Sequence, residues 1–126
     1  MIPEELNRIT EAIIGAAIAV HRTLGPGLLE SVYETCLAHE LTKRGLSVEC
    51  QQTLPVRYDT ICVESGYRID LLVEDLVIVE LKSVDKMIPL YESQLLTYLR
   101  LSGRRLGLLI NFNVIFVTDG IKRMAL

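Results

Sequence analysis

The stretch from Arg68 to Lys82 constrains the fold of this chain more than any other. Two short runs of apolar and β-branched residues, 69–73 and 77–79, indicate buried strands that lie close enough in sequence to form a hairpin. Asp70 interrupts the first run, and Glu80 directly follows the second. A buried carboxylate is costly unless it pairs with a partner or binds a ligand. The stretch therefore predicts a functional site as well as a hairpin.

The length of the connection between these strands decides whether the two carboxylates meet. With a two-residue turn at Glu74-Asp75, Asp70 would pair with Val79 and point away from Glu80. With a three-residue loop, Asp70 pairs with Glu80, and side chains opposite each other lie about 5 Å apart at Cβ. Two carboxylates at that distance repel unless a cation bridges them. We predict an odd-length loop or a bulge, and a divalent cation between Asp70 and Glu80.

Lys82 lies two residues beyond Glu80 and therefore points to the same face of the strand. Oxygen ligands suit Mg²⁺ or Mn²⁺. An ammonium group beside such a site can orient or activate a water, or stabilise charge that develops on a phosphate. The alternative is a surface hairpin in which Asp70 or Glu80 forms an ordinary salt bridge with Lys82, because Glu-x-Lys is common by chance.

The composition fits one domain over residues 1–126, since half of the residues are hydrophobic and 23% are charged. Three widely spaced cysteines, Cys36, Cys50 and Cys62, lack metal-ligand spacing, and we expect reduced, mostly buried thiols in a cytoplasmic protein. The apolar run 12–20 is too short to span a bilayer, so no membrane partner is expected. The net charge of −3 gives no global support for nucleic-acid binding.

Apolar periodicity and breakers predict the order helix, helix, strands, helix, strand. The expected helices cover residues 4–23, 28–44 and 89–102. The expected strands cover residues 46–54, 56–58, 69–73, 77–82 and 106–110, with a short last strand over 121–126. Pro55 indicates an edge strand or a break, and Asp59-Thr60 marks a turn. This order predicts an α/β domain with a mixed sheet.

Several polar side chains on the predicted helices do not fit a plain core. Glu30 and Tyr33 share one helix face, as do Gln94 and Tyr98, and His21 ends the first helix. Each also has an ordinary explanation. The helix dipole favours Glu30 in a first turn and His21 in a last turn, and Gln94 and Tyr98 could lie on a solvated face.

Together these segments resemble the GxxExxY protein family of bacteria and archaea, within the PD-(D/E)XK nuclease superfamily. The signature is Gly27 to Tyr33, and the resemblance continues in order over nearly the whole chain. It includes residues 13–17, 20–21, 24–27, 80–82, 94–98 and 109–112. The resemblance implies a restriction-endonuclease-like fold, with a central mixed β-sheet flanked by helices. Its α-β-β-β-α-β core would here carry an extra N-terminal helix.

The resemblance also implies roles for the acidic residues. Asp70 and Glu80 would be the metal-binding carboxylates, Lys82 the motif lysine, and Glu30 the acidic residue of the helix before the sheet. Glu30 could hold a second cation. Ile69 replaces the proline of the superfamily's name, a position where that proline is often missing.

Gln94 and Tyr98 resemble the Gln-x-x-x-Tyr motif of the RecB-like branch, which supports the active site and nucleic-acid contacts. Tyr33 and Arg100 are further candidates for such support. In that branch an upstream histidine can be a metal ligand, and His21 is the candidate here. The four cysteines of the iron–sulfur cluster in some relatives are missing, so no cluster is expected. The basic residues that could contact phosphates are Lys86, Arg100, Arg104, Arg105, Lys122 and Arg123.

The implied activity is metal-dependent hydrolysis of phosphodiester bonds, with DNA favoured over RNA and a homodimer as one way to span a duplex. The alternative is a non-enzymatic module that keeps the fold and binds nucleic acid or protein. The complete set of Asp, Glu-x-Lys and Gln-x-x-x-Tyr favours the enzyme. The acidic charge and small size favour the module.

Overall fold

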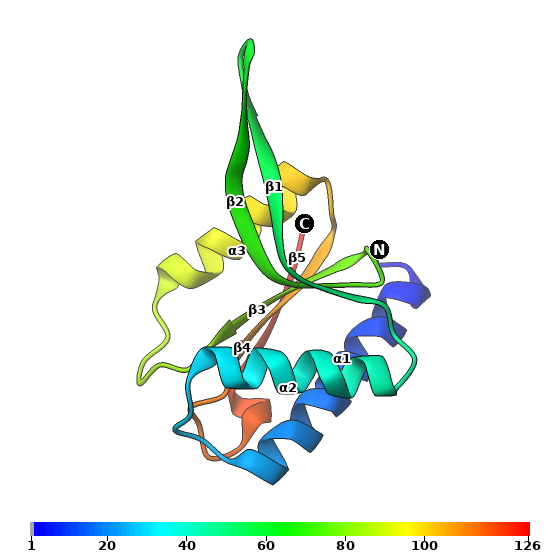
Figure 1. Cartoon of the computed structure of the whole chain (residues 1–126), viewed down its shortest axis with the longest axis vertical. Coiled ribbons are helices and arrows are strands. Elements are labelled where there is room, and N and C mark those ends of the chain that lie inside the picture. The colour runs from blue at the N-terminus through cyan, green and yellow to red at the C-terminus, as the bar shows by residue number, and fades with distance from the viewer. Residues whose placement is uncertain (1) are drawn as a thin grey trace.

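The computed structural model describes residues 2–126, so Met1 of the predicted domain lies outside the described residues. Five strands form one sheet with three α-helices packed against it (Figure 1). The helices are α1 (Glu4–Leu24), α2 (Glu30–Lys43) and α3 (Pro89–Ser102). The strands are β1 (Val48–Tyr58), β2 (Ile61–Val73), β3 (Val77–Lys82), β4 (Leu106–Asn111) and β5 (Ile121–Ala125). A 3₁₀ turn that the sequence did not predict, η1 (Val117–Gly120), precedes β5.

The strands lie in the order β1-β2-β3-β4-β5. Only β3 and β4 are parallel, and α3 connects them; the other neighbours are antiparallel. The run from α2 to β4 is the predicted α-β-β-β-α-β core, with α1 added before it and β5 after it. The predicted PD-(D/E)XK-like mixed α/β fold is therefore confirmed.

Different helices cover the two faces of the sheet. Helices α1 and α2 cover one face, where Ile13 and Leu37 belong to the same buried cluster as Leu71 and Val79. Helix α3 covers the other face, where Leu95 and Leu99 pack with Ile69, Leu72, Ile78 and Leu109. Along β3, alternate residues therefore enter alternate layers, as the period of a strand requires. Since Ile78 faces α3, Glu80 and Lys82 point toward the α3 side as well.

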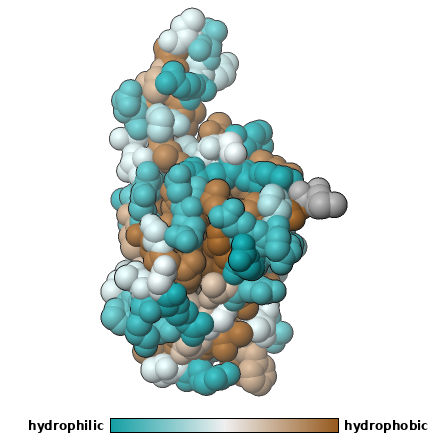
Figure 2. All heavy atoms as spheres, turned by 90° about the vertical axis from the view of Figure 1, so that its right-hand side faces the viewer, coloured by the Kyte–Doolittle hydropathy of each residue, from teal (hydrophilic) through white to brown (hydrophobic). Residues whose placement is uncertain are grey.

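The first two strands are longer than the sequence suggested. The predicted turn at Asp59-Thr60 is confirmed because Tyr58 pairs with Ile61, but β2 begins at Ile61 and not at Ile69. Residues 53–68, which we call the β-arm, project from the rest of the molecule (Figure 1), and hydrophilic side chains gather at the outer end (Figure 2). In β2 the polar run Glu64-Ser65-Gly66 interrupts the apolar alternation by which a strand is usually recognised.

Pro55 lies within β1, and the strand continues through it. The register between β1 and β2 shifts between Leu54 and Val56, so Pro55 marks a bulge in an edge strand. On the facing strand, a Cβ added to Gly66 would lie 2.2 Å from Cγ2 of Val56. The bulge therefore requires a glycine opposite it.

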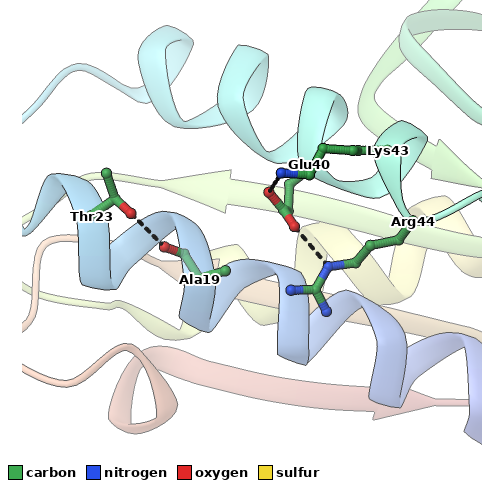
Figure 3. A network of polar contacts seen from close by, with 5 residues as sticks. All are labelled: Ala19, Thr23, Glu40, Lys43 and Arg44. Atoms are coloured by element: carbon green, nitrogen blue, oxygen red, sulfur yellow. Dashed lines mark hydrogen bonds and ion pairs between the residues drawn. The ribbon is translucent and has the colours of Figure 1, made fainter.

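Charged side chains on α2 reach across the surface of α1. Glu40 accepts a hydrogen bond of 2.8 Å from Nε of Arg44 and lies 3.6 Å from Nζ of Lys43 (Figure 3). The guanidinium group of Arg44 is held against α1, where a Cβ added to Gly15 would lie 3.1 Å from Nη1. Gly15 therefore leaves room for the Arg44 guanidinium group on the surface of α1.

The cysteines are less buried than predicted. Cys36 is half-buried, whereas Cys50 and Cys62 are exposed, and all three are free. The prediction of mostly buried thiols is wrong because Cys50 and Cys62 lie at exposed positions of β1 and of the β-arm. Within residues 2–126, no helix combines the length and apolar character needed to cross a bilayer.

Candidate active site

The loop between β2 and β3 has the three-residue length that brings the two strand carboxylates together. Val73 pairs with Val77, and the amide of Leu76 donates a 3.0 Å hydrogen bond to the carbonyl oxygen of Val73. Glu74 and Asp75 adopt left-handed conformations, with φ of 55° and 56°. The predicted odd-length loop is confirmed, and the two-residue turn is excluded.

Asp70 and Glu80 lie at the first position beyond the regular ladder of β2 and β3. The ladder ends at the pair of Leu71 and Val79, so the next facing residues are the two acids. The Asp70 amide donates to Oε1 of Glu80 over 3.3 Å, and the Leu81 amide donates to Oδ2 of Asp70 over 2.9 Å. Each carboxylate thus accepts a backbone hydrogen bond from the opposite strand. These two hydrogen bonds fix both side chains in place.

The environment of Glu80 favours its protonated form. The side chain is buried, with 6% of the residue exposed. Burial first, and then the negative charge of Asp70, raise the pKa of Glu80 to about 9, although Lys82 lowers it in part. At neutral pH Glu80 therefore holds a proton. A divalent cation could replace this proton, which makes the pair chemically suited to hold one.

Lys82 lies beside the carboxylates but does not form a salt bridge with them. Its Nζ lies 4.4 Å from the centre of the Tyr91 ring on α3, a cation–π contact. Among the described residues, the ion pairs do not include one between Lys82 and either Asp70 or Glu80. The ordinary salt-bridge interpretation of the hairpin is therefore excluded.

Tyr98 of α3 faces the same pair of acids. Burial first, and then the charge of Glu80, raise the pKa of Tyr98, whereas a hydrogen bond with Gln94 lowers it. The Tyr98 ring stacks on Tyr67 of the β-arm, with centroids 4.8 Å apart. Gln94 and Tyr98 therefore contact each other on one face of α3, as their spacing predicted, with Tyr98 turned toward the carboxylates and Gln94 exposed.

Two residues near Asp70 were missed by sequence reasoning. Gln51 of β1 donates from Nε2 to Oδ1 of Asp70 over 3.2 Å and also to the carboxylate of Glu34 on α2. Burial raises the pKa of Glu34, with a further contribution from the charge of Asp70. Glu34 follows Glu30 by one helical turn, a spacing that could have revealed it. Gln51 has a left-handed φ of 54°, which no sequence signal indicates.

Glu30 is exposed at the first position of α2. Its charge contributes to the raised pKa of Glu34, although less than burial and Asp70 do. Its nearest electrostatic link to Asp70 in this structure therefore runs through Glu34. Arg100 is exposed near the C-terminal end of α3, beyond Tyr98.

Tyr33 and His21 hold loops rather than face the carboxylates. The Tyr33 hydroxyl donates to the carbonyl oxygen of Gly25 over 2.6 Å and accepts from the Leu28 amide over 3.1 Å. Its ring stacks on Phe112 at 4.5 Å. Tyr33 therefore shapes the glycine-rich connection before α2.

His21 is buried, and its Nε2 lies 2.8 Å from the carbonyl oxygen of Val114 and 3.1 Å from that of Phe112. Because carbonyl oxygens only accept hydrogen bonds, Nε2 carries the proton and is a donor. In this arrangement the ring anchors the segment after β4. A metal-binding role for His21 stays a prediction.

Across residues 2–126, no group of three or more histidine, cysteine or acidic side chains is placed to hold a metal ion. An ion at Asp70 and Glu80 would draw two ligands from the protein. Mg²⁺ commonly keeps several waters and uses only one or two carboxylates, so two are compatible with such a site.

Comparison with known proteins places this geometry in a family. A sequence model of the PD-(D/E)XK nuclease superfamily matches residues 7–124. No curated protein and no solved structure matches the chain. The family match spans all three helices in whole or in large part and every strand except the last residue of β5. The chain therefore belongs to the PD-(D/E)XK nuclease superfamily.

Proposed function

We propose that this chain is a metal-dependent nuclease that hydrolyses phosphodiester bonds, with DNA favoured as its substrate. Membership of the superfamily supports a nuclease-type function. The observation that carries the proposal is the facing pair of Asp70 and Glu80, in which each carboxylate accepts a backbone hydrogen bond from the opposite strand and Glu80 is buried. The Gly27 to Tyr33 signature and the Gln94–Tyr98 pair support assignment to the GxxExxY family and the RecB-like branch.

Asp70 and Glu80 would hold Mg²⁺ or Mn²⁺, because both prefer oxygen ligands. When bound, the ion would polarise the scissile phosphate and favour ionisation of a water. Gln51 and the Leu81 amide keep Asp70 aimed at Glu80, so the pair is preorganised. Glu30 and Glu34 add negative charge on the α2 side, and a second cation could be held there.

Lys82 supplies the positive charge that the chemistry needs on the α3 side of the site. Its ammonium group would position the attacking water or neutralise charge that develops on the phosphate. Tyr91 holds the ammonium in a defined place through the cation–π contact. Tyr98, whose pKa is raised, keeps its proton and can donate a hydrogen bond to a phosphate oxygen.

The direct test is cleavage of labelled single- and double-stranded DNA and RNA with Mn²⁺, with Mg²⁺ and with a chelator. We expect cleavage that requires metal and is lost in Glu80→Gln and Lys82→Ala. Removing an electrostatic group of this kind typically lowers kcat by about 10²–10³-fold. Glu49→Gln and Lys43→Ala, at exposed positions on β1 and α2, are the matched controls and should cleave normally.

Cleavage that survives in Glu80→Gln and Lys82→Ala would come from a contaminant and would refute the assignment of these residues. A melting experiment separates binding from chemistry, because a ligand of the folded state raises the melting temperature. Mn²⁺ should stabilise the native chain but not Glu80→Gln. Metal binding without cleavage of any substrate would favour the non-enzymatic module.

A further inference from the structure

A groove runs between the β-arm and the C-terminal end of α3. Its volume is about 400 Å³. Three arginines line it, Arg57 from the arm and Arg100 and Arg104 from the end of α3 and the residues after it, together with Tyr67 and Ser102. The other lining residues are apolar, and none of them is acidic. We call this feature the arginine groove.

The three guanidinium groups differ in whether another side chain already binds them. Asp75 fixes the side chain of Arg104. Nη2 of Arg104 donates to Oδ1 of Asp75 over 2.8 Å, and Nε of Arg104 donates to the Asp75 carbonyl oxygen over 3.1 Å. Arg57 and Arg100 are exposed, and within residues 2–126 neither side chain has a hydrogen-bond or ion-pair partner. The groove therefore holds unneutralised positive charge in a chain with a net charge of −3. This distribution is complementary to a polyanion.

The groove is linked to the candidate active site through Tyr67. Tyr67 lines the groove and stacks on Tyr98, which is close enough to Glu80 to sense its charge. Tyr67 also precedes Asp70 by three residues in β2, and three strand residues span about 10 Å. A polynucleotide strand whose scissile phosphate sits at Asp70 and Glu80 could therefore reach the groove with its neighbouring phosphates.

We propose that the arginine groove binds the phosphodiester backbone of the substrate strand to one side of the scissile phosphate, with Arg57 and Arg100 as the phosphate contacts. The proposal rests on the proposed nuclease function and adds where its substrate lies. It also assigns a role to the β-arm, which brings Arg57 to the side of α3. Arginine suits this role because its planar fork can bind phosphate oxygens in pairs.

The test is binding of fluorescein-labelled DNA and RNA oligonucleotides, single-stranded and duplex, measured by anisotropy in chelator so that no cleavage occurs. Arg57→Ala and Arg100→Ala should each weaken binding. Each should also reduce the slope of log K against log salt by about 0.7–0.9, the amount expected for one lost phosphate contact. Arg8→Ala, an equal loss of charge at an exposed position on α1, should bind like the native chain.

Lysine at both positions provides a second variant pair, which should keep part of the affinity because the charge remains. Unchanged melting temperatures would show that Arg57→Ala and Arg100→Ala fold normally. The deciding variant carries both Arg57→Ala and Arg100→Ala. Its affinity and its slope of log K against log salt decide the proposal. A double variant that matches the native chain in both would overturn it, as would a native chain that binds none of the four oligonucleotides.

The outcome is separable from that of the nuclease proposal. If the native chain binds but never cleaves, and the arginine variants lose binding, the groove stands and the nuclease assignment fails. If cleavage depends on Glu80 and Lys82 but the arginine variants bind normally, the nuclease stands and the groove fails. The preferred oligonucleotide shows whether a single strand or a duplex lies in the groove.

Discussion

The centre of the sheet is buried whereas the β-arm is mostly exposed, although β2 runs through both. In the centre, β4 is buried at every position and β3 at every position before Lys82. In the β-arm most residues are exposed, and no third strand or helix covers its outer end (Figure 1). Asp70 lies next to the border between them, just beyond the last ladder pair of β2 and β3. The candidate site therefore stands where a rigid core meets an open surface.

This contrast gives one small chain both a rigidly held pair of carboxyl groups and a large exposed surface. Packing from two layers fixes the backbone of β3, and with it Glu80. The β-arm depends mainly on cross-strand contacts, which contribute only about 0.2–1 kcal/mol per pair. Side chains on the arm can consequently serve binding at little cost to the fold. Three predictions would sharpen or break this contrast.

The largest effect is expected from truncating an isoleucine in the centre of the sheet. Ile78→Ala, which opens a cavity between β3 and α3, should lower the free energy of unfolding by about 2–5 kcal/mol. Ile61→Ala near the end of the arm, where 58% of the residue is exposed, should change it by less than about 0.5 kcal/mol. Urea denaturation measures both. Equal losses would show that the arm is part of the cooperative core.

A pH-dependent effect is expected at the border. In the metal-free chain, burial and Asp70 raise the pKa of Glu80 from 4.5 to about 9, so the folded state holds a proton that the unfolded chain has released. Stability is therefore greatest below pH 4.5 for this group and falls as pH rises toward 9. The slope should reach about 1.4 kcal/mol per pH unit.

Glu80→Gln should remove that contribution, and the difference between the two proteins is measured by denaturation in chelator at several pH values. Mn²⁺ requires the ionised carboxylate, so its stabilising effect should grow with pH in the native chain only. Glu49→Gln, at an exposed position, should keep the native pH profile. A native chain with the same profile as Glu80→Gln would mean that Glu80 is not buried as the structure shows.

The smallest effect is expected at the loop that joins β2 to β3. Asp75→Ala removes the ion pair with Arg104, but the Asp75 side chain is 79% exposed and the pair is screened by water. We expect a loss below about 1 kcal/mol in urea denaturation. Because the Nε of Arg104 also bonds the Asp75 carbonyl oxygen, the arginine should stay in place. A loss above 2 kcal/mol would show that this loop helps to hold the sheet together.

The hairpin that carries Asp70 and Glu80 could be predicted because its geometry is local. Alternation along β3 places Glu80 and Lys82 on one face, and the odd length of the loop sets Asp70 opposite Glu80. The helical spacing of Gln94 and Tyr98 was equally informative. The sequence did not reveal that β2 starts at Ile61, because the polar run Glu64-Ser65-Gly66 interrupts its apolar alternation.

The remaining parts of the site could not be predicted because they depend on how distant elements pack. Glu34 and Gln51 reach Asp70 only when α2 and β1 are laid against the end of the β2–β3 ladder. The resemblance made His21 a candidate metal ligand and Tyr33 a candidate for site support, yet in the structure both bond to backbone groups of loops. Spacing places a side chain on a face of its own element but does not say what that face meets.

By itself the sequence determined the mixed α/β fold, the superfamily and the facing carboxylates. Each of these follows from periods of 2 and 3.6 residues or from short motifs that act within one element or one hairpin. Only the tertiary structure decided that burial gives Glu80 its proton, that Tyr91 holds Lys82, and that Arg57 and Arg100 line one groove. These features arise from distances between elements, and such distances are fixed by the packing of the whole core.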